Sequence, residues 1–500
     1  MDPFAGGGAI PLEAQRLGLE AHAHDLNPVA VMINKAMIEI TPKFADMPPV
    51  NPDDRINRAD STWKGAQGLA ADIRYYGTWM KEEAFRRIGH MYPKVNVPKE
   101  QGGGEVVVIA WIWARYTTCP NPACGCEIPL VSSYILSKKG NIAWAEPVVK
   151  DKKLSFVVHQ GKCPKGKETS KVGRAAVFRC PVCGETTSDS YIKKMGIEHN
   201  IREKLMAIVG EAKGKKRIYI DPSISPYVCE TSQNIDPLQG AISLNPRWFS
   251  PPSSGLFEFH ELYTKRQLLA LTTFSDLVSV VIAKVENDAI QAGVKNDFIS
   301  LDSGGNNAKA YGEAIGVCLT FALDKAANLW SSLVGWMNDR GAFRETFSRQ
   351  AMPMVWDFAE ANPFSTSAGN FLMFVERCAD AIQYLPINVQ PGFANQYDAQ
   401  SNCGLKDVMV STDSPYYDNI GYADLSDCFY VWMRRCLQPY FPKLFSTMLV
   451  PKSDELIATP VRHDGSVEKA KQHFENGMTE ACRMIYPELF IAVDHKQCFS

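Results

Sequence analysis

A run of glycines directly before a helix-forming segment opens the chain, and this feature constrains the fold more than any other. The run spans residues 2–9 (DPFAGGGA), and good helix formers continue to Leu17 before Gly18, which is suited to end a helix. Glycines let a backbone approach a ligand closely, and the first N–H groups of a helix are free to bind it. The run is therefore typical of a loop that binds a nucleotide or a nucleoside.

A short strand and an acidic residue follow this loop. Residues 19–25 (LEAHAHD) alternate small and polar side chains and end at Asp25, where a ribose-binding carboxylate is expected, about 20 residues after the glycines. Residues 29–40 then predict an amphipathic helix, so the chain begins as an α/β fold. No Gly-Lys-Ser/Thr follows the glycines, which argues against a P-loop, whereas a dinucleotide-binding fold of the dehydrogenase type stays open.

A second motif lies far along the chain. Residues 408–412 (VMVST) predict a buried strand that runs into Asp413, Ser414, Pro415 and Tyr416. An acid, a turn and an aromatic ring at the carboxyl end of a strand suit a pocket for a base. Methylation of an exocyclic amine requires hydrogen bonds that localise the nitrogen lone pair, which Asp413 and a nearby backbone carbonyl would supply, while Tyr416 would stack on a base outside the duplex. A type I turn with a packed tyrosine is the alternative.

Together the two motifs resemble motifs I and IV of amino-group methyltransferases, of which the fourth is an acid or amide followed by Pro-Pro and an aromatic residue. Three longer runs resemble the family of adenine-specific DNA methylases that contain a zinc ribbon. These runs are 109–130 (IAWIWARYTTCPNPACGCEIPL), 349–370 (RQAMPMVWDFAEANPFSTSAGN) and 416–435 (YYDNIGYADLSDCFYVWMRR).

This resemblance implies a Rossmann-like core that binds S-adenosylmethionine and methylates adenine N6 in DNA. By position, Asp25 would bind the ribose, and the methionine side of the cofactor would be lined by Asp2, Phe4, Gly6 and Gly8. The catalytic site would comprise Asp413, Ser414, Pro415 and Tyr416. Ser414 departs from the family because it stands where the first proline is usual, although any residue keeps the backbone carbonyl at that place.

A large insertion is expected between the two motifs. Roughly 380 residues separate Asp25 from Asp413, far more than a sheet crossover needs. Apolar residues at helical spacing over 262–286, 311–336 and 371–382 predict a helical region within it. The expected parts are the N-terminal methyltransferase core with the cofactor motif (1–60), a helical connector (61–104), a zinc-ribbon insertion (105–217), a mostly helical insertion placed by analogy for target recognition (218–400), and the C-terminal core with the catalytic motif (401–500).

Paired cysteines in the insertion predict a structural zinc site. Cys119 and Cys124 form one knuckle with Pro120 and Gly125, and Cys180 and Cys183 form a second with Pro181 and Gly184. Such prolines and glycines favour tight turns that direct two thiolates at one ion, and four thiolates leave no open position for substrate. Cys126 and Cys163 are weaker candidates for ligands because neither forms so clear a knuckle, and unliganded core cysteines are the alternative.

Composition and charge bear on location and partners. There is no signal segment at the N-terminus and no uncharged apolar run of membrane-spanning length, so we expect a cytoplasmic protein without a membrane partner, whose 14 cysteines serve as ligands or core thiols. Residues 150–217 hold 17 Lys and Arg against 7 Asp and Glu, a balance of +10 in a chain of net charge −2. This segment is expected to contact DNA phosphates, although a solvated charge run is the alternative. Other subunits of a modification or defence system are further expected partners.

Several functions from other classes remain open on sequence alone. Cytosine C5 chemistry is disfavoured because the chain contains no Pro-Cys pair, whereas cytosine N4 and RNA amines use the same chemistry as adenine N6. The glycine loop begins at Asp2 without the strand that should precede it, and the chain ends before the remaining strands of such a core, so we expect truncation at both ends. A catalytically silent or split zinc-containing DNA-binding protein is therefore the alternative to an enzyme.

Overall fold

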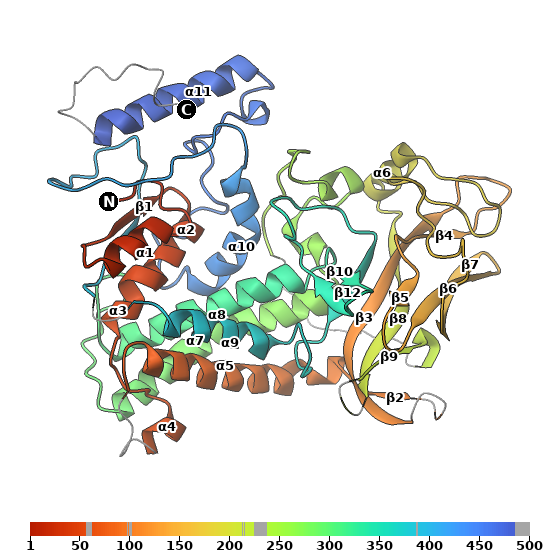
Figure 1. The fold of residues 1–500 in the computed structure, drawn as a ribbon, viewed down its shortest axis with the longest axis horizontal. Coiled ribbons are helices and arrows are strands. Elements are labelled where there is room, and N and C mark those ends of the chain that lie inside the picture. Colours follow the sequence, from red (N-terminus) through yellow and green to blue (C-terminus); the bar gives the residue numbers. More distant parts are fainter. Residues whose placement is uncertain are drawn as a thin grey trace.

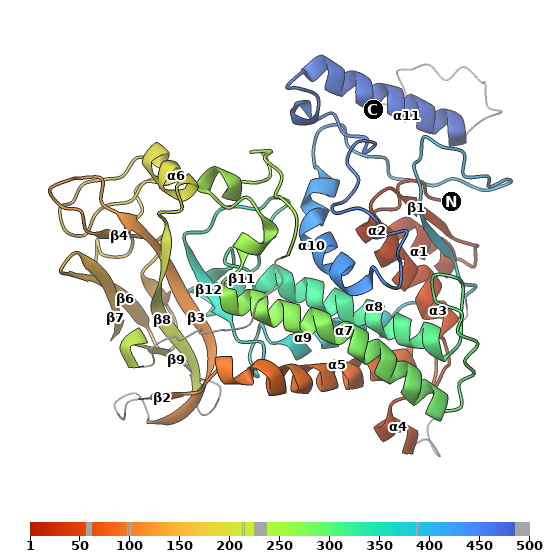
Figure 2. The same ribbon diagram turned by 180° about the vertical axis from the view of Figure 1, so that it is seen from behind.

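The computed structural model describes residues 1–56, 63–97, 99, 103–212, 214, 216–224, 238–386 and 389–485. Helices and strands are mixed along the chain, in agreement with the α/β class in its broad form. Figure 1 shows a part with the glycine loop at one end, long helices across the middle and a large sheet at the other end. Figure 2 shows the same order from behind.

The part that carries the glycine loop is built on short parallel segments. Strand β1 (His22–Asp25) pairs in parallel with β13 (Phe393–Gln396), and Asp2 forms a parallel bridge to Ala23 on the other side of β1. Parallel neighbours connected through helices place their carboxyl ends at the same edge. The glycine loop after Asp2 and the acid that ends β1 therefore lie at one edge.

Residues 408–412 lie beside the first residue of the chain, but the prediction of a buried strand there is wrong. The Met1 amino group donates to Met409 O over 2.7 Å, and Ser411 N donates to Met1 O over 3.1 Å, which is the pattern of parallel neighbours. No ladder extends from these two bonds, and Met409 is 78% exposed. The order of the parallel segments across this region is thus 393–396, 22–25, 1–2 and 409–411.

Helices cover these segments. The predicted helix over 29–40 is confirmed as α2 (Pro28–Asn34), which begins with Asn27 as its cap and continues as the π-helical segment η1 (Lys35–Ile40). The other helices around these segments are α1 (Ala9–Arg16), α3 (Thr41–Lys43), α10 (Tyr422–Leu437) and α11 (Val467–Ile485), whereas the short α4 (Pro52–Ile56) lies away from them (Figure 1). Residues 486–500 of the expected C-terminal core lie outside the described residues.

Long helices connect this part to the large sheet (Figures 1 and 2). They are α5 (Gln67–Ile88), α7 (Lys265–Gln291), α8 (Ala308–Leu329) and α9 (Phe371–Gln383), so the three predicted helical stretches are confirmed, although α8 ends before Trp330. By length and composition α7 is apolar enough to cross a membrane, although Asp276 interrupts its apolar run, so the prediction that no uncharged run reaches this length is not contradicted. Most of that stretch is buried against the rest of the protein, as in a core helix.

The large sheet takes strands from both expected insertions. Its order is β12 (Asp357–Ala361), β3 (Gly104–Thr118), β8 (Arg202–Ala212) and β9 (Lys216–Ile220), and the short β2 (Val95–Val97) and β4 (Glu127–Leu130) pair with β3. A buried ion pair of 2.7 Å between Arg266 of α7 and Glu360 of β12 joins helix to sheet. The remaining elements are β5 (Ile135–Ser137), β6 (Ala143–Lys150) and β7 (Lys153–Gln160) in one sheet, β10 (Gly335–Met337) and β11 (Ala342–Arg344) in a hairpin, and α6 (Asp189–Ile197).

Candidate functional site

One cavity of about 640 Å³ is lined by both sequence motifs. It lies where the parallel segments end, and its walls come from the loops after Asp2, β1, β13 and residue 412. Ligands of open α/β sheets bind at this edge, next to the place where the strand order reverses. The structure therefore brings together all nine residues predicted for the cofactor and the base, namely Asp2, Phe4, Gly6, Gly8, Asp25, Asp413, Ser414, Pro415 and Tyr416.

The glycine loop is held in a conformation that other residues adopt poorly. Gly8 has φ 82°, and a Cβ there would lie 2.4 Å from Met37 Cε and 2.6 Å from Asn34 Oδ1. The Asn34 amide donates to Gly6 O over 3.0 Å and to Ala30 O over 2.9 Å, which ties the loop to α2. Gly8 is needed for both its backbone angle and its lack of a side chain.

Asp25 connects the glycine loop to the end of β1. Its two carboxylate oxygens accept hydrogen bonds of 2.8 Å, Oδ2 from Gly6 N and Oδ1 from Asn27 N. Burial raises the pKa of Asp25 from 3.8 to about 6, against the effect of these two hydrogen bonds. Each oxygen keeps a lone pair for a further donor, so a ribose hydroxyl can bind without displacing the backbone.

A short hydrogen bond joins the two motifs directly. Thr412 Oγ1 donates to Asp2 Oδ1 over 2.6 Å, and Phe4 N donates to the same oxygen over 3.1 Å. Burial raises the pKa of Asp2 while both hydrogen bonds lower it. Residues 410 positions apart in the sequence thus fix one another beside the cavity, which Asp2 lines.

The loop after Thr412 presents an exposed acid and an exposed ring. Tyr416 is 57% exposed, and its hydroxyl donates to the Asp413 carboxylate at 3.1 and 3.0 Å, which raises the pKa of Tyr416. Behind them, Tyr417 O accepts from Ala458 N over 2.8 Å, and the Tyr417 ring packs edge-on against Phe474 of α11 at 5.2 Å. The loop is anchored on its inner side, while Asp413 and Tyr416 face solvent.

The charge of the cavity is strongly one-sided. Six carboxylates line it, and no lysine or arginine is among its lining residues in the described part of the chain. Such a lining attracts a cationic ligand and repels phosphates. This argues against the pyrophosphate of a dinucleotide, which was the alternative for the glycine loop.

Several lining residues were not singled out from the sequence. Asn27 caps α2 through Val29 N at 3.0 Å and donates to Ser426 Oγ of α10 over 2.8 Å, so it joins the two helices beside the cavity. Tyr422 and Ser426 belong to the run 416–435 that carried the family resemblance, which was the available signal. No local pattern marked Glu455, which also lines the cavity.

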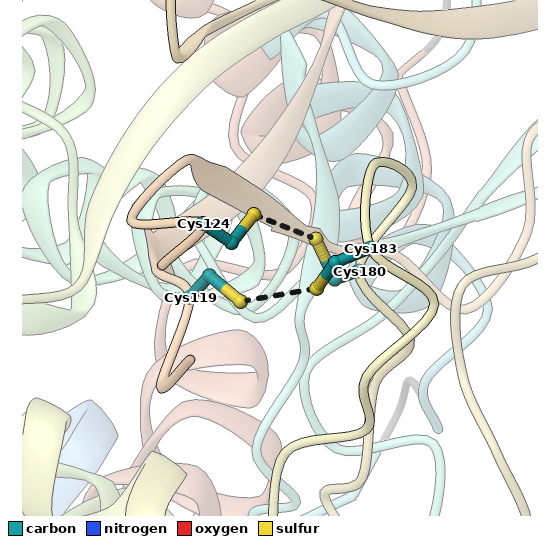
Figure 3. A group of neighbouring side chains, drawn as sticks. All are labelled: Cys119, Cys124, Cys180 and Cys183. Atoms are coloured by element: carbon teal, nitrogen blue, oxygen red, sulfur yellow. Dashed lines mark hydrogen bonds between the residues drawn. The ribbon is translucent and has the colours of Figure 1, made fainter. Parts of the chain in front are cut away.

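The four predicted metal ligands come together at the other end of the molecule. The sulfur atoms of Cys119, Cys124, Cys180 and Cys183 lie within 4.8 Å of one another, and Figure 3 shows their side chains converging from two loops. Sulfur–sulfur distances are 3.7 Å for Cys119–Cys183 and 3.8 Å for Cys124–Cys180. Zinc–sulfur bonds of about 2.3 Å in a tetrahedron require edges of about 3.8 Å, so the cluster is the right size for such an ion.

The two weaker candidates differ in position. Cys126 is buried in the cluster, with its sulfur 3.3 Å from that of Cys180 and 3.4 Å from that of Cys124. These contacts are shorter than a tetrahedral edge of about 3.8 Å, so Cys126 fits less well as a fifth ligand than as a buried thiol packed against the four. Cys163 lies outside the cluster, where its thiol contacts Pro164 O.

Comparisons with known proteins add no relative. No protein-family model matches the sequence, and neither a curated protein nor a solved structure matches the chain.

Proposed function

We propose that the chain is an S-adenosylmethionine-dependent methyltransferase that methylates adenine N6 in DNA. One observation carries the proposal: the glycine loop and the Asp413 loop, far apart in sequence, line a single cavity at the carboxyl ends of parallel segments. The order of those segments and the helices around them support a Rossmann-like core.

The lining of the cavity favours this cofactor over others that glycine loops bind. S-adenosylmethionine carries a positive sulfonium, which suits a cavity whose described lining holds six carboxylates and no lysine or arginine. Asp25 would accept from the ribose hydroxyls, and the free N–H groups after Gly8 would face the cofactor.

The Asp413 loop would then hold the amine. S-adenosylmethionine supplies an electrophilic methyl group when it is bound. Asp413 Oδ accepts a hydrogen of the base amine in place of the Tyr416 hydroxyl, and Ser414 O accepts the second, which localises the nitrogen lone pair. The Tyr416 ring, released from Asp413, stacks on the base and shields it from water.

The cysteine cluster would hold a structural zinc ion close to a basic surface. Most described lysines and arginines of residues 150–217 are exposed, among them Lys193 and Lys194 on α6. The Tyr191 hydroxyl of α6 donates to Thr118 O, next to Cys119, so a hydrogen bond connects the helix to the chain segment that carries the cluster. A zinc-supported surface of this charge suits DNA phosphates.

Transfer of labelled methyl groups to unmethylated DNA tests the proposal. We expect N6-methyladenine among the nucleosides after digestion, and none from Asp413→Ala, which should still bind the cofactor. Glu468→Ala, an exposed change on α11, is the matched control and should behave like the parent chain.

Each other outcome identifies a different function. If the methylated product is cytosine N4 or RNA, the proposed substrate is wrong and the proposed cofactor is right. Bound cofactor with no transfer above the Asp413→Ala level would favour a silent zinc-containing DNA-binding protein, and absence of cofactor binding would refute the proposal.

A further inference from the structure

A second cavity of about 360 Å³ lies beside the first. Residues 451–462, here called the strap, separate the two, and Glu455 and Ile457 line both. The strap is a single segment of chain, and two of its residues reach both cavities, so little of the protein lies between them. Two neighbouring nucleotides can therefore place their bases on opposite sides of the strap.

Ion pairs hold the strap against α10. Arg462 Nη2 lies 2.6 Å from Asp424 Oδ2 of α10, and Arg462 Nη1 lies 2.7 Å from Glu455 Oε2. The same Nη1 donates to Lys452 O over 3.0 Å, and Lys452 pairs with Asp427 at 2.7 Å. Both ends of the strap are fixed, so the second cavity is formed before any ligand arrives.

The second cavity suits a neutral polar ligand. Lys452 and Arg462, the lysine and arginine of its described lining, are paired with acids, so neither is free to bind a phosphate. His473 Nε2 lies 3.0 Å from Glu455 O, and because a carbonyl only accepts, this nitrogen carries a hydrogen and the other ring nitrogen, Nδ1, is left for a ligand. Burial, followed by the neighbouring His473 and Arg462, lowers the pKa of His463, whose ring lies 4.9 Å from that of His473. Two imidazole rings side by side can donate to or accept from the hydrogen-bonding edge of a base.

A cation lies beside the catalytic loop, on the chain segment that lines the second cavity. Ser243 and Asn245 line the cavity, and Asn245 Oδ1 accepts from Arg247 N over 3.1 Å. The Arg247 side chain is 50% exposed, lies over the Trp248 ring and pairs with Asp418 at 3.0 Å. An exposed ion pair contributes little stability, so a phosphate can take the place of Asp418.

We propose that the second cavity receives the nucleobase next to the target adenine in the same DNA strand, with Arg247 on the adjoining phosphate. His463 and His473 read the edge of that base by hydrogen bonds, and the enzyme therefore prefers particular neighbours. This inference rests on the proposed methyltransferase function.

DNA duplexes with one adenine between randomised positions test it, with every methylated product sequenced. The parent chain is expected to discriminate by about tenfold or more at one neighbouring position, as hydrogen-bonded base readout does. His473→Ala and His463→Ala should flatten that preference while transfer continues, and His473→Gln should keep part of it. Arg247→Ala should lower transfer equally on all sequences and reduce the salt dependence of binding by about one phosphate contact.

The outcomes distinguish a failure of this inference from a failure of the proposed methyltransferase function. An unchanged neighbour preference in both histidine variants, or none in the parent chain, would overturn the inference and leave the methyltransferase intact. Absence of transfer to any sequence would overturn both. Cofactor binding and the melting temperature of each variant show whether it is folded, so a loss of preference is attributable to the cavity.

Discussion

Replacing Asp25 with asparagine is expected to weaken cofactor binding strongly while leaving the stability of the protein nearly unchanged. In the folded chain the pKa of Asp25 is about 6 against an ordinary 3.8. A raised pKa means that the folded state holds the proton more tightly than the unfolded state does. The stability contributed in this way is fully present below pH 3.8 and is lost as the pH rises through 6.

The size of the effect follows from these values. At 1.36 kcal/mol per pKa unit, the ionised Asp25 disfavours folding by about 3 kcal/mol at pH 8 relative to its protonated form. Asparagine removes that cost, but its NH₂ group faces either Gly6 N or Asn27 N, which leaves a partly buried donor without an acceptor at about 1–3 kcal/mol. The two effects nearly cancel.

Calorimetry and thermal melting at pH 5 and pH 8 measure both quantities. The parent chain should bind S-adenosylmethionine more weakly as the pH falls through 6, because protonated Asp25 is a poorer acceptor for the ribose. The affinity of Asp25→Asn should be low and independent of pH, and its melting temperature at pH 8 should differ by only a few degrees. A variant that binds the cofactor normally but melts far lower would refute this reasoning and make Asp25 a structural residue.

Three further changes test other parts of the structure. Gly8→Ala should lower the free energy of unfolding by about 1–3 kcal/mol and abolish cofactor binding, measured by calorimetry. Gly7→Ala, whose Cβ meets no protein atom within 4 Å, should leave the free energy of unfolding nearly unchanged. Cys180→Ser should eliminate one bound zinc per chain in elemental analysis and lower the melting temperature as a chelator does, and Cys163→Ser should retain the metal. Glu360→Gln removes the negative charge that pairs with the buried Arg266, and it should lower the free energy of unfolding in urea by about 3–5 kcal/mol. A loss of less than about 1 kcal/mol would contradict this prediction.

Local patterns marked residues that the structure brings together, because the chemistry they suggest depends on local geometry. A particular backbone turn is needed by the glycines, by the acid at Asp25 and by the cysteine knuckles. The residues that form a turn are close in sequence, so a short sequence pattern can indicate it. The structure places the predicted residues in one cavity and one cluster. Their roles in catalysis stay a prediction.

The errors arose where distant segments decide the outcome. Residues 408–412 have the composition of a strand, yet strand formation depends on a neighbour, and here the two backbone hydrogen bonds to Met1 do not extend into a ladder among the described residues. Strand β12 joins β3 across about 240 positions, so the expected zinc-ribbon and helical insertions share a sheet, which no local pattern indicates. Cys126 enters the cluster because Cys119 N donates to Cys126 O, a contact that cysteine spacing does not encode.

The hydrogen bond between Thr412 and Asp2 has a consequence for how the two ligands would bind. Since it connects the glycine loop to the Asp413 loop, ordering either loop lowers the entropy that remains to be lost by the other. In the proposed methyltransferase, by reciprocity, the factor by which S-adenosylmethionine would tighten DNA binding equals the factor by which DNA would tighten the binding of S-adenosylmethionine. The concentration of the methyl donor would thus set the residence time of the protein on DNA as well as the rate of methylation.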